Sequence, residues 1–243
     1  MIDIKDIENK IINADCMDIL KQLPDKCIDL VCTDCPYHVG HKGGGGRCEK
    51  RWMTAGQLEN YENTKAGKMF EFNDINFEDW LPEVYRVLKD NTHCYIMING
   101  VNLAELQKQA EKVGFVYQNI LVWEKNNATP NKFYMQKLEY ILMLRKGKER
   151  WINNMGQKNI LRVPNNVGNK VHPTEKPVSL MQVLIENSTN VGDIVLDPFA
   201  GSSPVAVACE KSGRKYVCIE IDPKYYEASL RRLDDEQRQG MLF

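Results

Sequence analysis

Short apolar runs alternate with helical patterns along the whole chain. Seven runs predict strands, and most are continuous rather than alternating, which is typical of strands covered by helices on both faces. The predicted strands are Ile11–Ala14, Ile28–Thr33, His93–Ile98, Phe115–Trp123, Tyr140–Leu144, Ile194–Leu196 and Tyr216–Ile221. Apolar positions at helical spacing predict helices at Met17–Leu23, Phe77–Leu88, Leu103–Val113, Lys176–Ser188, Pro204–Lys211 and Pro223–Arg232.

The order of these elements predicts the fold. Repeated strand–helix–strand units indicate an α/β protein with a doubly wound, mostly parallel, seven-stranded sheet. The fourth and fifth predicted strands are joined by a polar loop without a helix, so we expect that pair to be antiparallel. Asn102 followed by Glu105 predicts a helix start, and Gly114 and Gly213 predict helix ends.

Length and composition favour one soluble domain. The 243 residues are 43% hydrophobic and 27% charged, which is ordinary for a globular enzyme and unlike a disordered chain. No apolar run reaches the roughly 18 residues of a membrane span, and the first residues lack a signal-peptide pattern. Eight cysteines in such a chain are expected to be reduced thiols. We therefore expect a single cytoplasmic domain, 1–243, without a membrane partner.

The net charge of −1 argues at first against a nucleic-acid partner. The charge is unevenly distributed, however, because the segment 125–176 has eleven Lys and Arg against three acids. A second basic stretch, 38–53, surrounds the four glycines Gly43–Gly46. Charge alone leaves two interpretations open for both segments: solvated loops, or a surface that binds a polyanion.

A turn after a C-terminal strand indicates a nucleoside cofactor. The sequence Asp197–Ser203 follows the sixth predicted strand, and Gly201 allows a ligand to approach the backbone. Asp197 would repel a pyrophosphate and suits a cofactor with a cationic end. Glu220, at the end of the next strand, is placed to accept hydrogen bonds from ribose hydroxyls. Alone, such an acid is more often a turn residue or a helix cap.

A second candidate site follows the strand Ile28–Thr33, at Asp34-Cys35-Pro36-Tyr37. Cys32 and Cys35 match C-x-x-C, but no second pair or nearby His completes a metal site, and in extended chain the two side chains point to opposite faces. A carboxylate, a carbonyl held by a proline and an aromatic ring instead form a polar clamp that suits a planar ring with an exocyclic amine.

Three motifs together resemble the DNA amino-methyltransferases of the β group, which use S-adenosylmethionine. Asp34–Tyr37 resembles their catalytic tetrapeptide, except that Cys35 stands in place of a proline. Asp197–Ser203 resembles their cofactor loop, although the following Pro204 departs from the usual glycine-rich continuation, and His172–Pro177 resembles the segment before that loop. The motif order is that of the group, and the resemblance extends from about Ile11 to Leu233.

The resemblance implies a circularly permuted, Rossmann-like methyltransferase fold and a role for each matching residue. Asp34 and the carbonyl of Cys35 would accept hydrogen bonds from the target amine, Pro36 would hold that carbonyl, and Tyr37 would stack on a flipped base. Lys176 is alternatively a helix N-terminal residue. The residues implied in S-adenosylmethionine binding are Asp15, Thr174, Lys176, Asp197, Phe199, Gly201, Ser202 and Glu220.

The implied reaction is methyl transfer to the N6 amine of a flipped adenine in double-stranded DNA. The initial Asp34 favours adenine, because serine commonly takes that place in the cytosine-N4 enzymes. Cytosine N4, RNA or a protein amide remain alternative substrates, and a catalytically inactive DNA-binding relative is an alternative from another class. A homodimer partner and a cognate restriction nuclease are further expected candidates.

Two insertions are expected to meet DNA: a Gly-rich stretch, 38–76, and a short target-recognition region, 146–171. The expected DNA-binding residues are Arg47, Lys50, Arg51, Arg145, Lys148, Arg150, Lys158 and Arg162. Asparagine pairs well with adenine edges, which makes the asparagines of the second region, Asn153, Asn154, Asn165 and Asn166, candidates for base recognition. The segment 122–127 is either a wall of the base pocket or a polar turn.

Overall fold

A single mixed sheet organises the computed structural model, which describes residues 1–36, 75–129, 133–165 and 176–240. The described strands lie in the order β1-β8-β7-β2-β3-β5-β4-β6. Their bounds are β1 Lys10–Asn13, β2 Leu30–Asp34, β3 Thr92–Ile98, β4 Val116–Thr129, β5 Gln136–Lys146, β6 Ile160–Leu161, β7 Ile194–Asp197 and β8 Lys215–Glu220. All neighbours are parallel except β3–β5 and β5–β4, so the sheet is mostly parallel as predicted.

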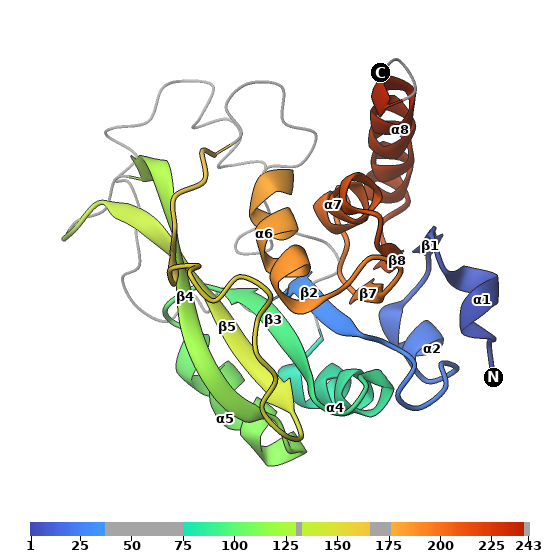
Figure 1. Cartoon of the computed structure of the whole chain (residues 1–243), viewed down its shortest axis with the longest axis horizontal. Coiled ribbons are helices and arrows are strands. Elements are labelled where there is room, and N and C mark those ends of the chain that lie inside the picture. Colours follow the sequence, from blue (N-terminus) through green and yellow to red (C-terminus); the bar gives the residue numbers. More distant parts are fainter. Residues whose placement is uncertain (37–74, 130–132, 166–175, 241–243) are drawn as a thin grey trace, which may run out of the picture.

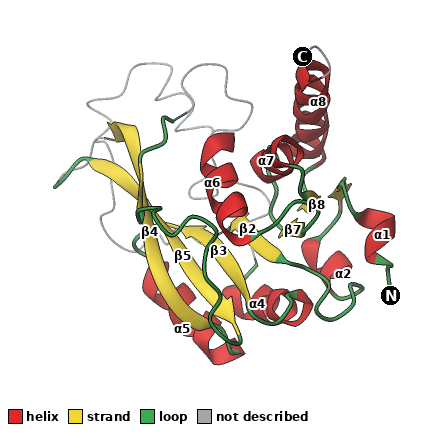
Figure 2. Cartoon of the chain, in the orientation of Figure 1, coloured by secondary structure: helices red, strands yellow, loops and turns green. Residues whose placement is uncertain are grey.

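Helices cover both faces of this sheet (Figures 1 and 2). One apolar cluster joins the sheet to the helices α6, α7 and α8, and another joins it to α2, α4 and α5. The helices are α1 Ile4–Ile7, α2 Cys16–Leu20, α4 Phe77–Val87, α5 Leu103–Val113, α6 Val178–Ser188, α7 Pro204–Ser212 and α8 Pro223–Gly240. The result is three layers, in which strands buried on both faces are continuously apolar. No helix in the described ranges has the length and apolar character to cross a membrane.

The connections reverse direction between β2 and β7, which are neighbours in the sheet. From β2 the chain reaches β3 through a connection that includes α4, whereas from β7 it reaches β8 on the other side through α7 (Figure 1). Ligands of open α/β sheets bind beyond the carboxyl ends of the strands at such a switch point. The topology therefore places a candidate site where Asp34 and Asp197 end their strands.

The predicted elements agree closely with the observed ones. All seven predicted strands are present, and the antiparallel pairing of β4 with β5 is confirmed. Gly114 and Gly213 end α5 and α7 with positive φ angles of 115° and 69°. Asn102 does precede α5, but it forms no side-chain cap; instead its backbone N–H and side-chain amide donate to Asn99.

Three features differ from the prediction. Two are short elements that the sequence pattern did not predict, β6 and α1; β6 has two residues, and α1 has four residues of which none is buried. The third is the segment 122–127, which is neither a turn nor a loop, because β4 continues through it and pairs with β5 as far as Thr129.

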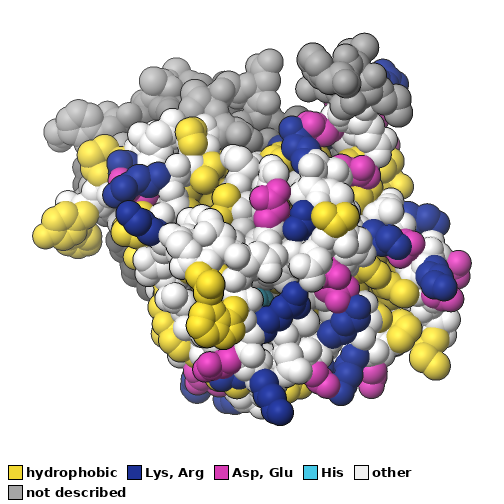
Figure 3. Space-filling model, in the orientation of Figure 1, with side chains coloured by type: hydrophobic (Ala, Val, Ile, Leu, Met, Phe, Trp, Pro, Cys, Tyr) yellow, Lys and Arg dark blue, Asp and Glu magenta, His cyan; other side chains and the backbone are white. Residues whose placement is uncertain are grey.

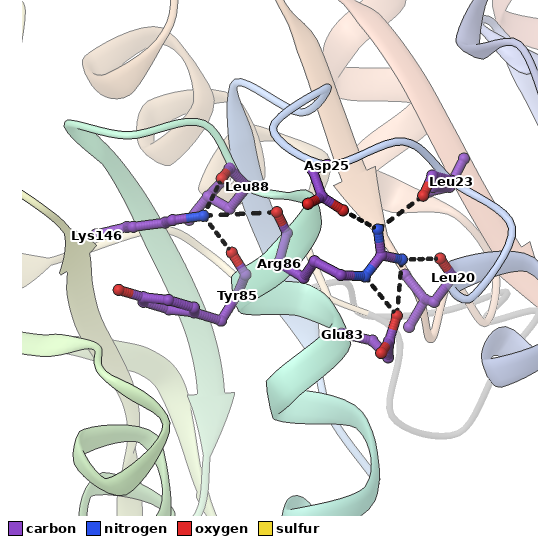
Figure 4. A network of polar contacts seen from close by, with 8 residues as sticks. All are labelled: Leu20, Leu23, Asp25, Glu83, Tyr85, Arg86, Leu88 and Lys146. Carbon is purple, nitrogen blue, oxygen red and sulfur yellow. Dashed lines mark hydrogen bonds and ion pairs between the residues drawn. The ribbon is translucent and has the colours of Figure 1, made fainter.

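A network of polar contacts ties the end of α4 to its neighbours (Figure 4). The Arg86 guanidinium donates to the carbonyls of Leu20 and Leu23 and to the carboxylates of Asp25 and Glu83. The buried ammonium of Lys146 donates to carbonyls of the last turn of α4 and its C-cap, Tyr85 and Leu88, at 2.6 and 2.7 Å. These carbonyls lack helical partners, so the lysine satisfies them.

Candidate functional site

The site begins with two aspartates at the carboxyl ends of neighbouring parallel strands. β2 ends at Asp34 and β7 ends at Asp197. Thr33 joins them, because its hydroxyl donates a 2.7 Å hydrogen bond to Asp197 Oδ1. Both strands lie in the middle of the sheet, so neighbouring strands cover them on both sides. The Asp34 side chain is nevertheless 29% exposed.

Asp197 is a buried carboxyl group without a nearby counter-charge in the described part of the chain. Its Oδ1 also accepts a 3.1 Å hydrogen bond from the backbone N–H of Phe199. Burial raises the pKa of Asp197 to about 7, against the effect of these two hydrogen bonds. A cationic ligand group would therefore be stabilised here, because it would supply the missing positive charge.

The loop between Asp197 and α7 has room for a ligand. Gly201 has a φ of +54°, and a Cβ added there would meet no described atom within 4 Å. Ser203 also has a positive φ, 50°, and its buried Oγ has no hydrogen-bond partner in the described structure. An unpartnered buried hydroxyl is costly, so a polar ligand group would relieve it. These features fit the polar end of a cofactor.

Glu220 ends β8, the strand next to β7. Its two oxygens accept the backbone N–H groups of Gly201 and Asp222 at 2.7 and 2.8 Å. Burial raises the pKa of Glu220, and these two hydrogen bonds act against the rise. A carboxylate has about four lone-pair positions, so Glu220 retains the capacity to accept ribose hydroxyls.

The other predicted cofactor residues of this half lie around the same edge. Asp15 is the N-cap of α2, where Oδ1 accepts the N–H of Met17 at 2.8 Å, and the preceding strand β1 pairs with β8. Phe199 packs edge-on against Trp80, with ring centroids 5.2 Å apart. The Ser202 hydroxyl accepts a hydrogen bond from Arg232 of α8, which ties the loop to that helix.

Asp34 lies at one end of a row of four charges. Lys176 Nζ is 2.7 Å from Asp34 Oδ2 and 3.3 Å from Glu139 Oε2, and Lys125 Nζ is 3.0 Å from Glu139 Oε1. Burial raises the pKa of Asp34, and Lys176 opposes that rise. Burial likewise disfavours the charged form of Glu139, but the two ammonium groups hold its pKa below the ordinary value. Lys176, expected beside the cofactor, thus contacts the candidate catalytic aspartate.

Cys32 and Cys35 point to opposite faces of the sheet, as extended chain requires. The Cys32 thiol contacts Met181 of α6, whereas the Cys35 thiol lies 3.6 Å from the Met97 carbonyl and belongs to the other apolar cluster. Burial raises the pKa of both thiols well above the ordinary value. Each is therefore a neutral packing group, and Pro36 follows them half-buried at the edge of the site.

Several predicted positions lie outside the described residues. Among the site residues these are Tyr37, Thr174, Arg47, Lys50 and Arg51. Nearly all of the Gly-rich stretch 38–76, the motif segment 172–175 and the last part of the region 146–171 lie there as well.

The basic residues of the second insertion separate into two groups. β5 pairs Ile141 with Met97 and Arg145 with His93, which puts Arg145 toward the amino edge of the sheet, about 13 Å further along the strand. Lys148 and Arg150 continue in that direction, away from Asp34. Lys158 and Arg162 instead flank β6, which pairs with β4 beside the carboxyl edge. The structure therefore brings only the second group near the site.

Acidic partners balance much of the basic segment. Glu124 accepts both Lys137 and Arg162, at 2.9 and 2.8 Å. Figure 3 shows Lys and Arg interspersed with Asp and Glu over the lower part of one face, with a further basic group beside apolar side chains on the projecting β4–β5 hairpin. Two of the basic side chains of the segment are therefore paired with an acid in the described structure, and the polyanion-binding surface stays a prediction.

Two asparagines predicted to read bases have structural contacts instead. The Asn153 amide donates to the carbonyls of Glu186 and Thr189 at the end of α6, at 2.7 and 2.8 Å. Asn154 Oδ1 accepts the N–H of Gly156. Asn165 is placed differently, because it contacts the β4 hairpin and lies near the carboxyl edge.

Sequence reasoning missed the partners of Asp34 and Asp197. Thr33 could have been found from its place beside Asp34 in the same strand. Glu139 and Lys125 carry no local signal, because strand pairing brings them to a residue about a hundred positions earlier. Ser203 lies within the loop Asp197–Ser203, but the resemblance implies no role for it.

Comparisons with known proteins agree with this arrangement. Residues 28–231 match the DNA methylase family. The chain is 30% identical to the DNA adenine methyltransferase YhdJ of Escherichia coli (strain K12), over 92% of this chain and 82% of that protein. It is 25% identical to M1.HpyAVI, solved as a SAM complex, with a TM-score of 0.67 over 92% of this chain and 99% of that one. PvuII DNA methyltransferase, cytosine-N4-specific, shares the fold, with a TM-score of 0.69 at 18% identity over 95% and 91% of the chains.

Proposed function

The chain belongs to the DNA methylase family, and from this premise, which makes it an S-adenosylmethionine-dependent DNA methyltransferase, we propose that its target is the N6 amine of adenine. One observation carries the proposal. A partly exposed carboxylate, Asp34, ends a central strand at the switch point, next to the strand that carries the candidate cofactor loop. The name of the relative YhdJ, an adenine methyltransferase, supports adenine over cytosine.

The proposed mechanism relies on positioning and electrostatics. The exocyclic amine is a weak nucleophile, because its lone pair is delocalised into the ring. Asp34 and the carbonyl of Cys35 accept its two N–H groups, orient the lone pair and stabilise the positive charge that develops on the nitrogen. The cofactor supplies an activated methyl group on a sulfonium, and no covalent enzyme intermediate is required.

The cofactor residues follow from the geometry on the other side of the switch point. Asp197 lies buried with no counter-charge from the described residues and suits the cationic part of S-adenosylmethionine. Glu220 retains lone pairs for the ribose hydroxyls, and the exposed Asp15 lies beside the adjoining strand end. The open space at Gly201 and the unpartnered Ser203 hydroxyl favour contact with the methionine end.

The DNA must approach the carboxyl edge of the sheet. A base within a duplex cannot reach Asp34, so it is flipped at a cost of a few kcal/mol. Lys158 and Arg162 flank this edge and are the proposed phosphate contacts among the described residues, whereas Arg145, Lys148 and Arg150 point to the opposite edge. Asn165 is the described asparagine best placed for the bases.

Product analysis tests the choice of base. Purified enzyme, isotopically labelled S-adenosylmethionine and unmethylated duplex DNA are incubated, and the nucleosides are separated by mass spectrometry after digestion. N6-methyladenine is the expected labelled product. Label in N4-methylcytosine would overturn the adenine assignment while leaving the methyltransferase activity intact.

A further inference from the structure

Asp34 and the three charges beside it form a continuous row on one face of the carboxyl edge. They alternate in sign: Lys125 of β4, Glu139 of β5, Lys176 before α6, and Asp34 of β2. Lys176 has a side chain only 9% exposed, and its ammonium lies between the two carboxylates. Asp34 and Glu139 are each about 30% exposed, so both carboxylates also face outward.

This arrangement sets Lys176 in competition with the target amine for the carboxylate of Asp34. Lys176 already donates to Asp34 Oδ2, which is an acceptor that the target amine needs. The amine nitrogen becomes positively charged during methyl transfer, and a neighbouring ammonium would repel that charge. Glu139 lies 3.3 Å from the same ammonium and offers it a second acceptor.

We propose that Lys176 is a positioning residue that holds Asp34 in the base-free enzyme and transfers to Glu139 when the target amine reaches Asp34. The inference rests on the proposed function, because it takes Asp34 as the acceptor of the amine. One donor replaces another on Asp34, no proton changes hands, and the ammonium remains paired throughout. Lys125 limits the transfer, since it competes for Glu139 from the other side.

The exchange predicts opposite effects for two substitutions. In Glu139→Gln the second acceptor of the ammonium loses its negative charge, so the ammonium stays on Asp34, which slows methyl transfer about tenfold and moves the acid limb of its pH profile downward. In Lys176→Met, the partly buried Asp34 lies beside Glu139 and loses the one ammonium that pairs with it among the described residues, so the acid limb moves upward by about one pH unit. Lys176→Arg keeps the charge and restores the limb toward its wild-type position.

The charged groups that face Asp34 in the described chain determine the direction in which the acid limb shifts. Lys176 lowers its pKa, Glu139 raises it, and Asp197 of the neighbouring strand is affected by the charge of Asp34 in turn. Asp197 is unchanged in every variant, and saturating S-adenosylmethionine removes its effect on cofactor binding. The remaining shifts of the acid limb then report the interactions of Asp34 with Lys176 and Glu139.

The test measures single-turnover methyl transfer to duplex DNA from pH 5 to 9, with enzyme saturated with S-adenosylmethionine. Lys137→Met is the matched control, because Lys137 pairs with Glu124 on the same hairpin rather than with the row. Its acid limb should coincide with that of the wild type. The exchange predicts opposite shifts for Glu139→Gln and Lys176→Met together with a rate at the pH plateau that is about tenfold lower in Glu139→Gln. A plateau rate equal to that of the wild type in Glu139→Gln, or shifts in one direction, would overturn the exchange.

The measurements separate failure of the exchange from failure of the proposed function. A wild-type enzyme that labels no adenine overturns the proposed function, and the exchange with it. A wild-type enzyme that labels adenine, combined with parallel shifts in the variants, overturns the exchange alone. If Lys176→Met does not fold, judged by circular dichroism, Glu139→Gln and Lys176→Arg still decide the direction of the shift.

Discussion

Asp197 combines burial with a pKa of about 7, and this makes cofactor binding pH-dependent. A cationic ligand stabilises the ionised carboxylate, so its binding lowers the pKa of Asp197 and releases a proton near neutral pH. Affinity for S-adenosylmethionine should therefore rise between pH 6 and 8. Calorimetry in two buffers of different ionisation enthalpy measures the proton released, and Asp197→Asn should abolish most of it. Equal proton release in that variant would contradict this account.

Substitution of Cys35 tests whether the second acceptor of the target amine is the backbone carbonyl or the thiol of this residue. The thiol is buried toward Met97 and its pKa is raised by burial, so it is a packing group. Cys35→Ala should keep the rate of methyl transfer within about threefold while lowering stability by about 1–2 kcal/mol through a small cavity. A rate measurement at saturating DNA checks this. A loss of a hundredfold or more would assign the chemistry to the sulfur.

At the scale of single residues, the sequence predicts functional side chains where a motif lies next to the end of a strand. Asp34, Asp197 and Glu220 could be selected because each ends a predicted strand, and the structure brings these strand ends together. Glu139 and the role of Lys176 could not be predicted, since antiparallel pairing and the approach to α6 create the contact.

Polar contacts hold the end of α4 in place, and substitution of Arg86 tests how much they contribute to stability. Its guanidinium satisfies two backbone carbonyls and two carboxylates, and its side chain is 28% exposed. Arg86→Ala should lower the free energy of unfolding by about 2–3 kcal/mol, because the carbonyls lose a charged donor. Lys26→Ala is the control, since the Lys26–Asp90 pair is exposed to solvent and its loss should change stability much less. Urea unfolding measures both, and equal losses would contradict the network's role.

Periodicity predicted elements well wherever burial was extensive. The seven apolar runs became strands, but α1, which buries none of its residues, was not predicted. β6 is set by its pairing with Val122 and Trp123 rather than by its own sequence. The segment 122–127 remains a strand because β4 runs from the core, where Trp123 is buried, into the outer part of the β4–β5 hairpin, where Asn126 and Asn127 are exposed.

For the whole molecule, the placement of charge matters more than its total. Lys158 and Arg162 lie beside the carboxyl edge, whereas Lys148 and Arg150 lie toward the amino edge. Lys158→Ala/Arg162→Ala should therefore weaken duplex binding about tenfold and reduce its salt dependence. Lys148→Ala/Arg150→Ala should have the smaller effect. Fluorescence anisotropy at 50 and 200 mM salt compares them, and the reverse order would place DNA on the other edge.

The central claim is that Asp34 acts on the target base while the neighbouring strand ends hold the cofactor. Its most direct test is a single comparison of Asp34→Ala with the wild type, measuring both S-adenosylmethionine affinity and methyl transfer to duplex DNA. The account predicts affinity within about threefold of the wild type and a loss of transfer of about a hundredfold or more. Retained transfer, or equal losses of affinity and transfer, would contradict it.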